Sequence, residues 1–314
     1  MRIFHNANYN FIKWRWHALI FSITIVWGGI ALMYLQGGMP LGIEFTGGTE
    51  LIVTFAQPTQ EDAVRAALDS VSKQKVVQKF GKPEENRIVV RLPLAEGAEQ
   101  DASIEADANK ARAALETAGL HPIEINTQIV GPQVGADLQS KGIWATLTAL
   151  GGILIYVAFR FRLTFAIGAI IATFHDILIT LVALWAFHFD LSLNVIAAIL
   201  TIAGYSVNDT IVVFDRVRED LRTMRKEPLD VIVNKAVNQT LGRTIITSGT
   251  TFLAVLALYL FGGEVLRSFA FTMLIGVITG TYSTVFIAAA IAIILSRRPT
   301  GGARVTAKAR TARA

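Results

Sequence analysis

Residues 204–219 read GYSVNDTIVVFDRVRE, and this stretch decides how the rest of the chain is interpreted. It closes an apolar run that begins near Leu191 and is long enough to span a bilayer. Asn208 and Asp209 lie inside this run, where a helix that faces lipid would carry neither an amide nor a carboxylate. An ionised side chain there costs at least about 2.5 kcal/mol unless it faces a protein interior or a water-filled cavity. We therefore expect Asp209 to have a structural or functional role inside the membrane.

The composition is typical of a membrane protein. Hydrophobic residues make up 53% of the 314 residues, and several apolar runs could cross a bilayer. The sequence contains no cysteine, which excludes disulfides and thiolate metal ligands but leaves the cellular compartment undecided. It also shows no phosphate-binding loop and no catalytic constellation. We therefore expect no enzymatic activity, no cofactor and no metal.

Charge is divided unevenly along the chain. Residues 37–140 contain nine Lys/Arg and fifteen Asp/Glu, whereas the remainder contains twenty basic and nine acidic residues. The basic residues of the remainder lie beside apolar runs, so orientation in a membrane explains them better than binding to nucleic acid does. We expect no nucleic-acid partner.

Six membrane spans are predicted. The first has no cleavage site before Gly37-Gly38, so we expect it to remain as a signal-anchor. The predicted divisions of the chain are residues 1–36 (N-terminus and first span), 37–140 (soluble domain), 141–295 (five further spans) and 296–314 (basic, disordered tail). The later spans are expected near residues 143–159, 164–187, 191–214, 244–261 and 268–295, with an interfacial amphipathic helix at Pro228–Leu241.

The distribution of basic residues orients these spans. Six spans place both termini on one side, and the segments on that side are rich in Lys and Arg, whereas the short loops between spans on the other side hold only Arg267. Because positive charge accumulates on the cytoplasmic side, we expect cytoplasmic termini and an external domain at residues 37–140.

The pattern of residues 37–140 predicts a small α+β domain. Alternation and turn signals indicate strands at Glu50–Phe55, Val76–Phe80, Arg87–Leu92 and Ile123–Val130, and helices at Gln60–Ser72 and Asp107–Ala118. The order βαββαβ is the ferredoxin-like arrangement. The predicted fold class is therefore a polytopic α-helical membrane protein with six transmembrane helices and a ferredoxin-like domain between the first and second.

Two arginines are candidate partners of Asp209. Asp209 lies five residues before Phe214, which places it about 7–8 Å inside the edge of its span. Arg216 falls on the same helical face, so a structural ion pair at the membrane edge is one interpretation. Arg243 opens the fifth span at a similar depth, where it either anchors the helix end by snorkelling or forms a switchable pair with Asp209.

A second carboxylate, Asp176, lies near the middle of the third span. Thr173, Asp176 and Thr180 share a helical face, whereas His175 points about 100° away, so we do not expect His175 and Asp176 to serve one partner. Asp176 is either a second relay residue or a buried hydrogen-bond acceptor. Gly276-x-x-x-Gly280 in the sixth span indicates close packing between helices.

Five motifs, in this order and spacing, resemble those of the SecD/SecF family of bacterial protein-export membrane proteins. They are GIEFTGGT at 42–49, VGPQVG at 130–135, His175-Asp176, the stretch at 204–219, and RTIITSGTT at 243–251. The resemblance runs from the first span to the sixth. Glu44 stands where the family commonly has Asp, which preserves the carboxylate. The structural residues of the first two motifs are Gly42, Glu44, Gly47, Gly48, Gly131, Pro132 and Gly135.

The resemblance implies half of a transporter of the resistance-nodulation-division superfamily in the bacterial inner membrane. SecD would supply the other six-span half, and the pair would act with SecYEG to draw preproteins outward at the expense of the proton-motive force. YajC, the translocating preprotein and membrane lipids are the other partners implied. In this family the positions matching Asp209 and Arg243 are tied to proton passage. We add Asp176 and Asn208 as further candidates for the proton relay.

Two other function classes stay open. A proton-coupled exporter of small molecules or lipids from the same superfamily would call for a larger external domain with an apolar pocket. A membrane scaffold would use Asp209 and Arg243 only as packing ions. Replacing Asp209 by Asn separates the scaffold from the proton-coupled alternatives, because a scaffold should keep its function.

Overall fold

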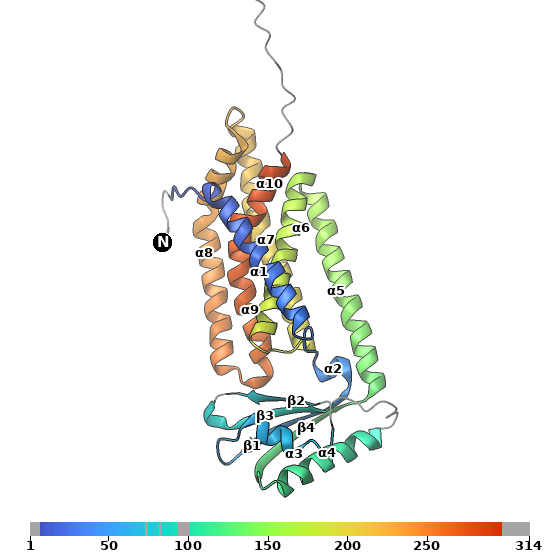
Figure 1. Cartoon of the computed structure of the whole chain (residues 1–314). Helices are drawn as coiled ribbons and strands as arrows, with labels where there is room; N and C mark the ends of the chain where they lie inside the picture. Colours follow the sequence, from blue (N-terminus) through green and yellow to red (C-terminus); the bar gives the residue numbers. More distant parts are fainter. Residues whose placement is uncertain (1–6, 73–74, 82, 93–100, 297–314) are drawn as a thin grey trace, which may run out of the picture.

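The computed structural model describes residues 7–72, 75–81, 83–92 and 101–296. Six helical segments are long and apolar enough to cross a membrane, and a four-stranded antiparallel sheet lies between the first and second of them in the chain. The sheet with its two helices sits at one end of the helical bundle (Figure 1). The predicted fold class is thus confirmed. Residues 297–314 of the predicted tail lie outside the described part of the chain.

The bundle consists of long helices whose apolar faces pack on one another. The sixth span is not a uniform α-helix, because a π-helical turn, η3 (Thr284–Ala288), joins its two α-helical parts. The bundle elements are α1 (Arg15–Leu35), α5 (Pro132–Arg160), α6 (Leu163–Ala186), α7 (Leu193–Thr223), α8 (Leu229–Phe261), α9 (Glu264–Ser283) and α10 (Ala289–Ser296).

The predicted interfacial helix at Pro228–Leu241 is wrong as a separate element. Helix α8 runs without a break from Leu229 to Phe261, so this segment is the first part of the fifth span's helix. Its apolar residues, among them Val233 and Val237, are buried in the main hydrophobic core of the bundle. The amphipathic pattern therefore reflects packing against protein rather than against the membrane surface.

Helix α5 also begins earlier than its apolar pattern indicates. Gly131 is its N-cap residue and Pro132 occupies the first turn, an arrangement that favours helix initiation. The first turns are polar, which is why hydropathy placed the span only from residue 143. The predicted division at residue 140 consequently falls within a continuous helix.

The sheet domain comprises β1 (Gly48–Phe55), β2 (Val76–Phe80), β3 (Arg87–Leu92) and β4 (Pro122–Val130), with helices α3 (Glu61–Ala67) and α4 (Asp101–Thr117). The strand order β2-β3-β1-β4, with every pair antiparallel, is that of a ferredoxin-like fold. Helix α3 is shorter than predicted, and α4 begins earlier.

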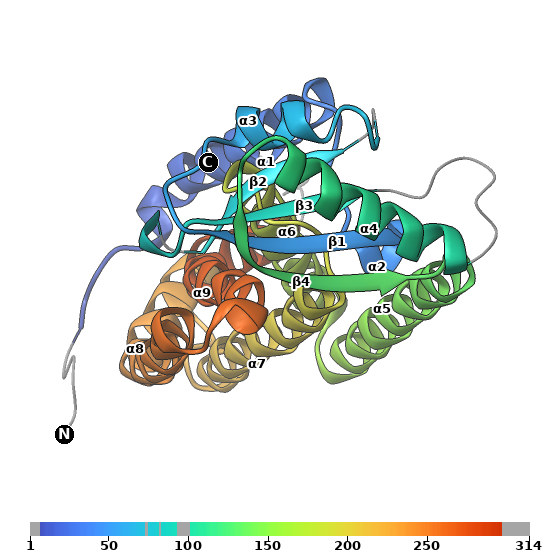
Figure 2. The same ribbon diagram turned by 90° about the horizontal axis from the view of Figure 1, so that it is seen from below.

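The two faces of this sheet have different neighbours. Leu51, Val53 and Phe55 of β1 are buried in the domain core, as the alternation of a half-buried strand requires. Glu50 and Ile52 point to the opposite face and line a groove together with residues of the bundle. Helices α3 and α4 cover the face that is turned away from the bundle (Figures 1 and 2).

The two glycine-containing motifs meet where the domain joins the bundle. Gly47 and Gly48, which follow the single-turn helix α2 (Ile43–Thr46), have φ values of 68° and 118°, a region that glycine adopts without strain. A Cβ on Gly135 would lie 3.2 Å from the Gly47 nitrogen, so α5 packs closely on this turn. Both motifs thus hold the start of β1 against α5.

Candidate functional site

Asp209 is buried at the junction of three helical segments. Its side chain is 8% exposed, and its Oδ1 accepts a hydrogen bond of 2.8 Å from the Thr244 hydroxyl on α8. Its Oδ2 is buried and has no hydrogen-bond partner among the described residues. A carboxylate oxygen without a donor is costly to bury in the ionised form. The site therefore leaves one oxygen of Asp209 available to hold a proton.

The π-helical turn of the sixth span lies beside Asp209. The hydroxyl of Thr284, its first residue, is 3.0 Å from that of Thr210 on α7. π-Helical turns are rare and occur frequently at functional sites. Here the turn brings a hydroxyl of the sixth span next to the α7 position that follows Asp209.

Arg243 is close to Asp209 but is not paired with it. It directly precedes Thr244, the donor to Asp209, and its own side chain is exposed. In the described part of the chain no ion pair joins Arg243 to Asp209. Asn208, the other candidate, is likewise exposed on α7. The structure thus brings the two charged residues to one level of adjacent helices and leaves them unpaired.

The interpretation that paired Asp209 with Arg216 is wrong. The Arg216 Nη1 lies 2.7 Å from Glu219 Oε2, and its Nε donates to Gln239 Oε1 at 2.5 Å. Seven residues correspond to roughly 10 Å along a helix, whereas a residue three positions away is a direct neighbour. Arg216 therefore belongs to a charged cluster at the helix end.

Asp176 occupies a different environment. It is fully buried, and its Oδ2 accepts hydrogen bonds from the hydroxyls of Ser206 on α7 (2.5 Å) and Ser283 on α9 (2.7 Å). Its Oδ1 is 3.0 Å from the His175 Nδ1. His175 thus contacts Asp176 directly, and the expectation that the two do not serve one common partner stays a prediction. Asp176 thus joins α6 to α7 and α9.

The Gly276-x-x-x-Gly280 motif makes this junction possible, and the close packing predicted from it is confirmed. A Cβ on Gly276 would lie 2.2 Å from the Ile202 Cδ1, and one on Gly280 would lie 3.1 Å from the Ser206 Cβ. Helix α9 therefore approaches α7 closely enough for hydroxyls of both helices to reach Asp176.

Sequence reasoning missed the hydroxyl residues that donate to the two carboxylates, Ser206, Ser283 and Thr244, and the neighbouring hydroxyl pair Thr210 and Thr284. The Thr247 hydroxyl, one helical turn after Arg243, donates to the Arg243 carbonyl of its own helix (3.0 Å). Serine and threonine are common in membrane helices, so their type alone gave no signal. Spacing along one helix gave no signal either, because Ser206 lies three residues before Asp209 but donates to Asp176 on another helix.

Family models match most of the chain. The model described as "Protein export membrane protein SecD/SecF, C-terminal" matches residues 110–298, and the model described as "SecD/SecF GG Motif" matches residues 36–59. The chain belongs to the SecD/SecF family. The second match contains Gly47 and Gly48, the two glycines with positive φ.

Individual SecD/SecF proteins are similar over nearly the whole length. The protein translocase subunit SecF of Rhodothermus marinus is 40% identical over 95% of this chain and 96% of its own. That of Escherichia coli O157:H7 is 40% identical over 92% of this chain and 88% of its own.

A solved structure has the same fold. The crystal structure of SecDF, a translocon-associated membrane protein from Thermus thermophilus, matches 95% of this chain at 32% identity with a TM-score of 0.82. A SecDF structure in the Super-membrane-facing form matches 93% at the same identity with a TM-score of 0.65. The chain spans 40% and 39% of the lengths of these two SecDF chains.

Proposed function

We propose that this chain is the SecF-type half of a protein-export complex, in which it uses the proton-motive force to promote export of preproteins. The observation that carries the proposal is the unpartnered, buried Oδ2 of Asp209 next to the unpaired Arg243. A group that captures a proton in the membrane needs an open proton site and a nearby charge that responds to its protonation. Family membership favours protein export over export of small molecules or lipids.

A second membrane half, SecD in this proposal, would cover the polar faces that α7 and α8 expose. Asn208 on α7, and Arg243 and Thr247 on α8, are exposed at positions inside the spans. Lipid is a poor environment for an amide and a guanidinium, whereas a partner helix can supply hydrogen bonds. Similarity to a part of the solved SecDF chains supports such an arrangement, because those chains are more than twice as long.

The same proposal gives the location and the partners. Both termini would lie in the cytoplasm and the sheet domain outside the inner membrane, because the basic residues gather at the opposite end of the bundle from the sheet. SecYEG would supply the channel, the translocating preprotein would pass near the sheet domain, and YajC and lipids would complete the surroundings. The chain would do mechanical work without enzymatic chemistry.

In the proposed cycle, a proton from outside binds the free oxygen of Asp209 and neutralises it. The neutral acid no longer attracts Arg243, so α8 shifts relative to α7, and the hydrogen bond from Thr244 adjusts with it. Loss of the proton to the cytoplasm restores the attraction. Each proton releases about 2.3 kcal/mol per 100 mV of membrane potential, and this energy drives the shift.

The test is proton-driven export in membrane vesicles that contain the Asp209→Asn protein. The amide fills the same space but cannot ionise, so we expect the proton-dependent part of export to be lost while insertion is preserved. Asp215→Asn is the matched control, because Asp215 is on the same helix and pairs with Arg160 at 2.6 Å near the surface. Undiminished export by Asp209→Asn would contradict the proposal.

A further inference from the structure

The loop between α6 and α7 is bound to the chain segment that leads into the sheet domain. The Gly42 N–H donates to the Leu191 carbonyl (2.9 Å), and the Leu191 N–H donates to the Pro40 carbonyl (2.8 Å). These bonds form a short parallel bridge between Leu41 and Leu191. A Cβ on Gly42 would lie 3.3 Å from the Leu191 carbonyl oxygen and closer still to the Glu44 carboxylate. The close approach therefore favours glycine at this position.

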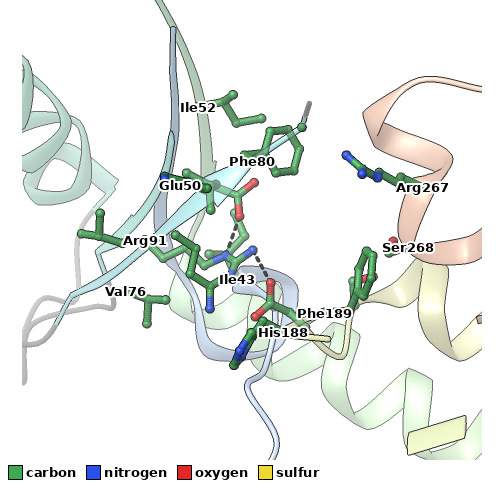
Figure 3. A pocket seen from close by; sticks show the side chains of 18 of the residues that line it. Ile43, Glu50, Ile52, Val76, Phe80, Arg91, His188, Phe189, Arg267 and Ser268 are labelled. Carbon is green, nitrogen blue, oxygen red and sulfur yellow. Dashed lines mark hydrogen bonds and ion pairs between the residues drawn. The ribbon is translucent and has the colours of Figure 1, made fainter. Parts of the chain in front are cut away.

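A side-chain bridge joins the same loop to the sheet itself. Arg91 on β3 donates from Nε to the Glu50 Oε2 at 2.6 Å, and its Nη2 pairs with the carboxylate of Asp190 in the loop. Arg91 and Glu50 are direct partners in the register of β1 and β3. Figure 3 shows the arginine between the two carboxylates, one from the sheet and one from the bundle.

This bridge is mostly buried, unlike an ordinary surface ion pair. The side chains of Glu50, Arg91 and Asp190 are 16%, 14% and 11% exposed. Desolvation lowers the pKa of Arg91, but the charges of Asp190 and Glu50 outweigh this effect and hold its pKa above the ordinary value. The guanidinium therefore stays charged, and removing it would leave two carboxylates in a poorly solvated position.

The bridge crosses a groove that separates much of the sheet from the bundle. The groove has a volume of about 1090 Å³ and is lined by Ile52 and Gln78 from the sheet and by Tyr259 and Ser268 from the bundle. Because this space lies between the two parts, a contact that spans it has a direct influence on the angle at which the sheet domain sits.

Asp190 is also close to the start of the helix that carries Asp209. Ser192 is the N-cap of α7, where its hydroxyl accepts from the Val195 N–H at 3.3 Å. Helix α7 then continues without a break from Leu193 to Thr223. A continuous helix moves along its axis as a unit, so an axial shift of α7 at Asp209 also moves its N-cap Ser192, two residues after Asp190.

We propose that Arg91 is a positioning residue that couples the sheet domain to α7. The Glu50–Arg91–Asp190 bridge makes the domain follow the outer end of α7, so that events at Asp209 reach the part of the protein outside the membrane. This coupling rests on the proposed function for its driving step, but the contact and its effect on domain position do not.

The test measures domain position and export in the full chain assembled with its partner half. The chain has no native cysteine, so Glu116→Cys on α4 and Val265→Cys on α9, both exposed, allow a spin-label distance to be measured across the groove. With the bridge intact, we expect one narrow distribution of the distance between the two labels. Arg91→Met and Asp190→Asn should each broaden this distribution. The double variant should be no broader than Arg91→Met alone, because the two residues act through one contact.

Two variants separate coupling from general damage. Arg87→Met is the matched control, since Arg87 lies on the same strand and pairs with Glu85 at 3.4 Å where both are about one-third exposed; it should leave the distribution and export unchanged. Arg91→Lys keeps the charge but lacks the fork that reaches two carboxylates, so it should give intermediate broadening and intermediate export.

The outcomes distinguish this inference from the proposed function. An unchanged distribution in both Arg91→Met and Asp190→Asn would overturn the bridge, and a broadened distribution with normal proton-driven export would overturn its role in coupling. Because Asp190 lies outside the sheet, Asp190→Asn remains informative if Arg91→Met does not fold. Normal export by Asp209→Asn would instead remove the proposed function and leave the domain contact standing.

Discussion

Two buried carboxylates of the bundle, Asp176 and Asp209, show how similar positions can serve different purposes. Asp176 is fully buried and has three hydrogen-bonding neighbours, whereas Asp209 is 8% exposed and has one donor and a free oxygen. The two sites are about one helical turn apart, because Ser206, a donor to Asp176, lies three residues before Asp209. A carboxylate whose two oxygens both have hydrogen-bond partners can join helices. Only a carboxylate with an oxygen that lacks a partner keeps a place for a proton.

The largest expected difference between the two sites is in stability. Asp176→Ala leaves two hydroxyls and an imidazole without their acceptor and should lower the free energy of unfolding by about 3 kcal/mol. Asp209→Ala removes one hydrogen bond and should cost about 1 kcal/mol. Thermal unfolding of the detergent-solubilised variants measures this difference. Equal losses of stability would mean that Asp209 is also a structural joint.

A smaller effect is expected from the donor to Asp209. Thr244→Val removes the hydroxyl that donates to Asp209 Oδ1 while keeping the shape of the side chain. It should reduce the stabilisation of ionised Asp209 by about 1 kcal/mol. Proton-driven export should then persist with a shifted pH dependence, and Thr244→Ser should restore the original profile. An unchanged profile in Thr244→Val would show that this contact does not tune the site.

The sheet domain should respond to external pH through Glu44, a carboxyl group beside the α6–α7 loop that is not part of the Glu50–Arg91–Asp190 bridge. Burial raises the pKa of Glu44. The group regains water when the domain moves away, and its pKa then returns toward the ordinary range near 4. The docked domain therefore binds this proton more tightly than the undocked one.

The sign of this effect follows from the raised pKa of Glu44. Its contribution to docking is fully present below the ordinary pKa and is lost as pH rises through the raised value, so protonation of Glu44 should favour docking. The other charged or titratable groups that line the same groove are Glu50, Glu61, Arg65, Asp69, Lys75, Lys79, Arg91, His188, Asp190, Tyr259 and Arg267. At neutral pH the spin-label distribution should be narrower in Glu44→Gln, whose amide cannot ionise, than in the unaltered chain, and the two should converge toward pH 4. An equal or broader distribution in Glu44→Gln at neutral pH would contradict this account.

The smallest effect is expected at Arg216. Its ion pair with Glu219 is partly exposed, so Arg216→Ala should change the free energy of unfolding by less than about 1 kcal/mol. Export should keep its dependence on the proton gradient, since Arg216 does not contact Asp209. A loss of proton coupling in this variant would return Arg216 to the candidate site.

The fold was largely predictable because each of its signals is local. Apolar runs gave the six spans, and alternation gave the four strands, since each depends on residues that are adjacent in sequence. The starts of α5 and α8 were not predictable from hydropathy. The first turns of α5 are polar and largely exposed, and those of α8 are amphipathic, so only the folded chain shows what covers Val233 or Val237.

The candidate site was predictable only in part, because its partners come from different helices. Asp209, Arg243 and Asp176 stood out as ionisable residues in apolar spans, a rule that needs no knowledge of packing. The rule could not tell which carboxylate has hydrogen-bond partners on both oxygens, since Ser283, a donor to Asp176, lies 107 residues away in the chain. Nor could it reveal Arg91, a charged residue in a soluble domain, as a partner of the loop at Asp190.

The central claim is that Asp209, and not Asp176, takes up the proton. Infrared difference spectroscopy of the assembled complex, recorded as pH is lowered, detects the C=O band of a carboxylic acid as it forms. We expect a band that disappears in Asp209→Asn and persists in Asp176→Asn, because of these two carboxylates only Asp209 has an oxygen without a hydrogen-bond partner among the described residues. A band that persists in Asp209→Asn and disappears in Asp176→Asn would contradict the account.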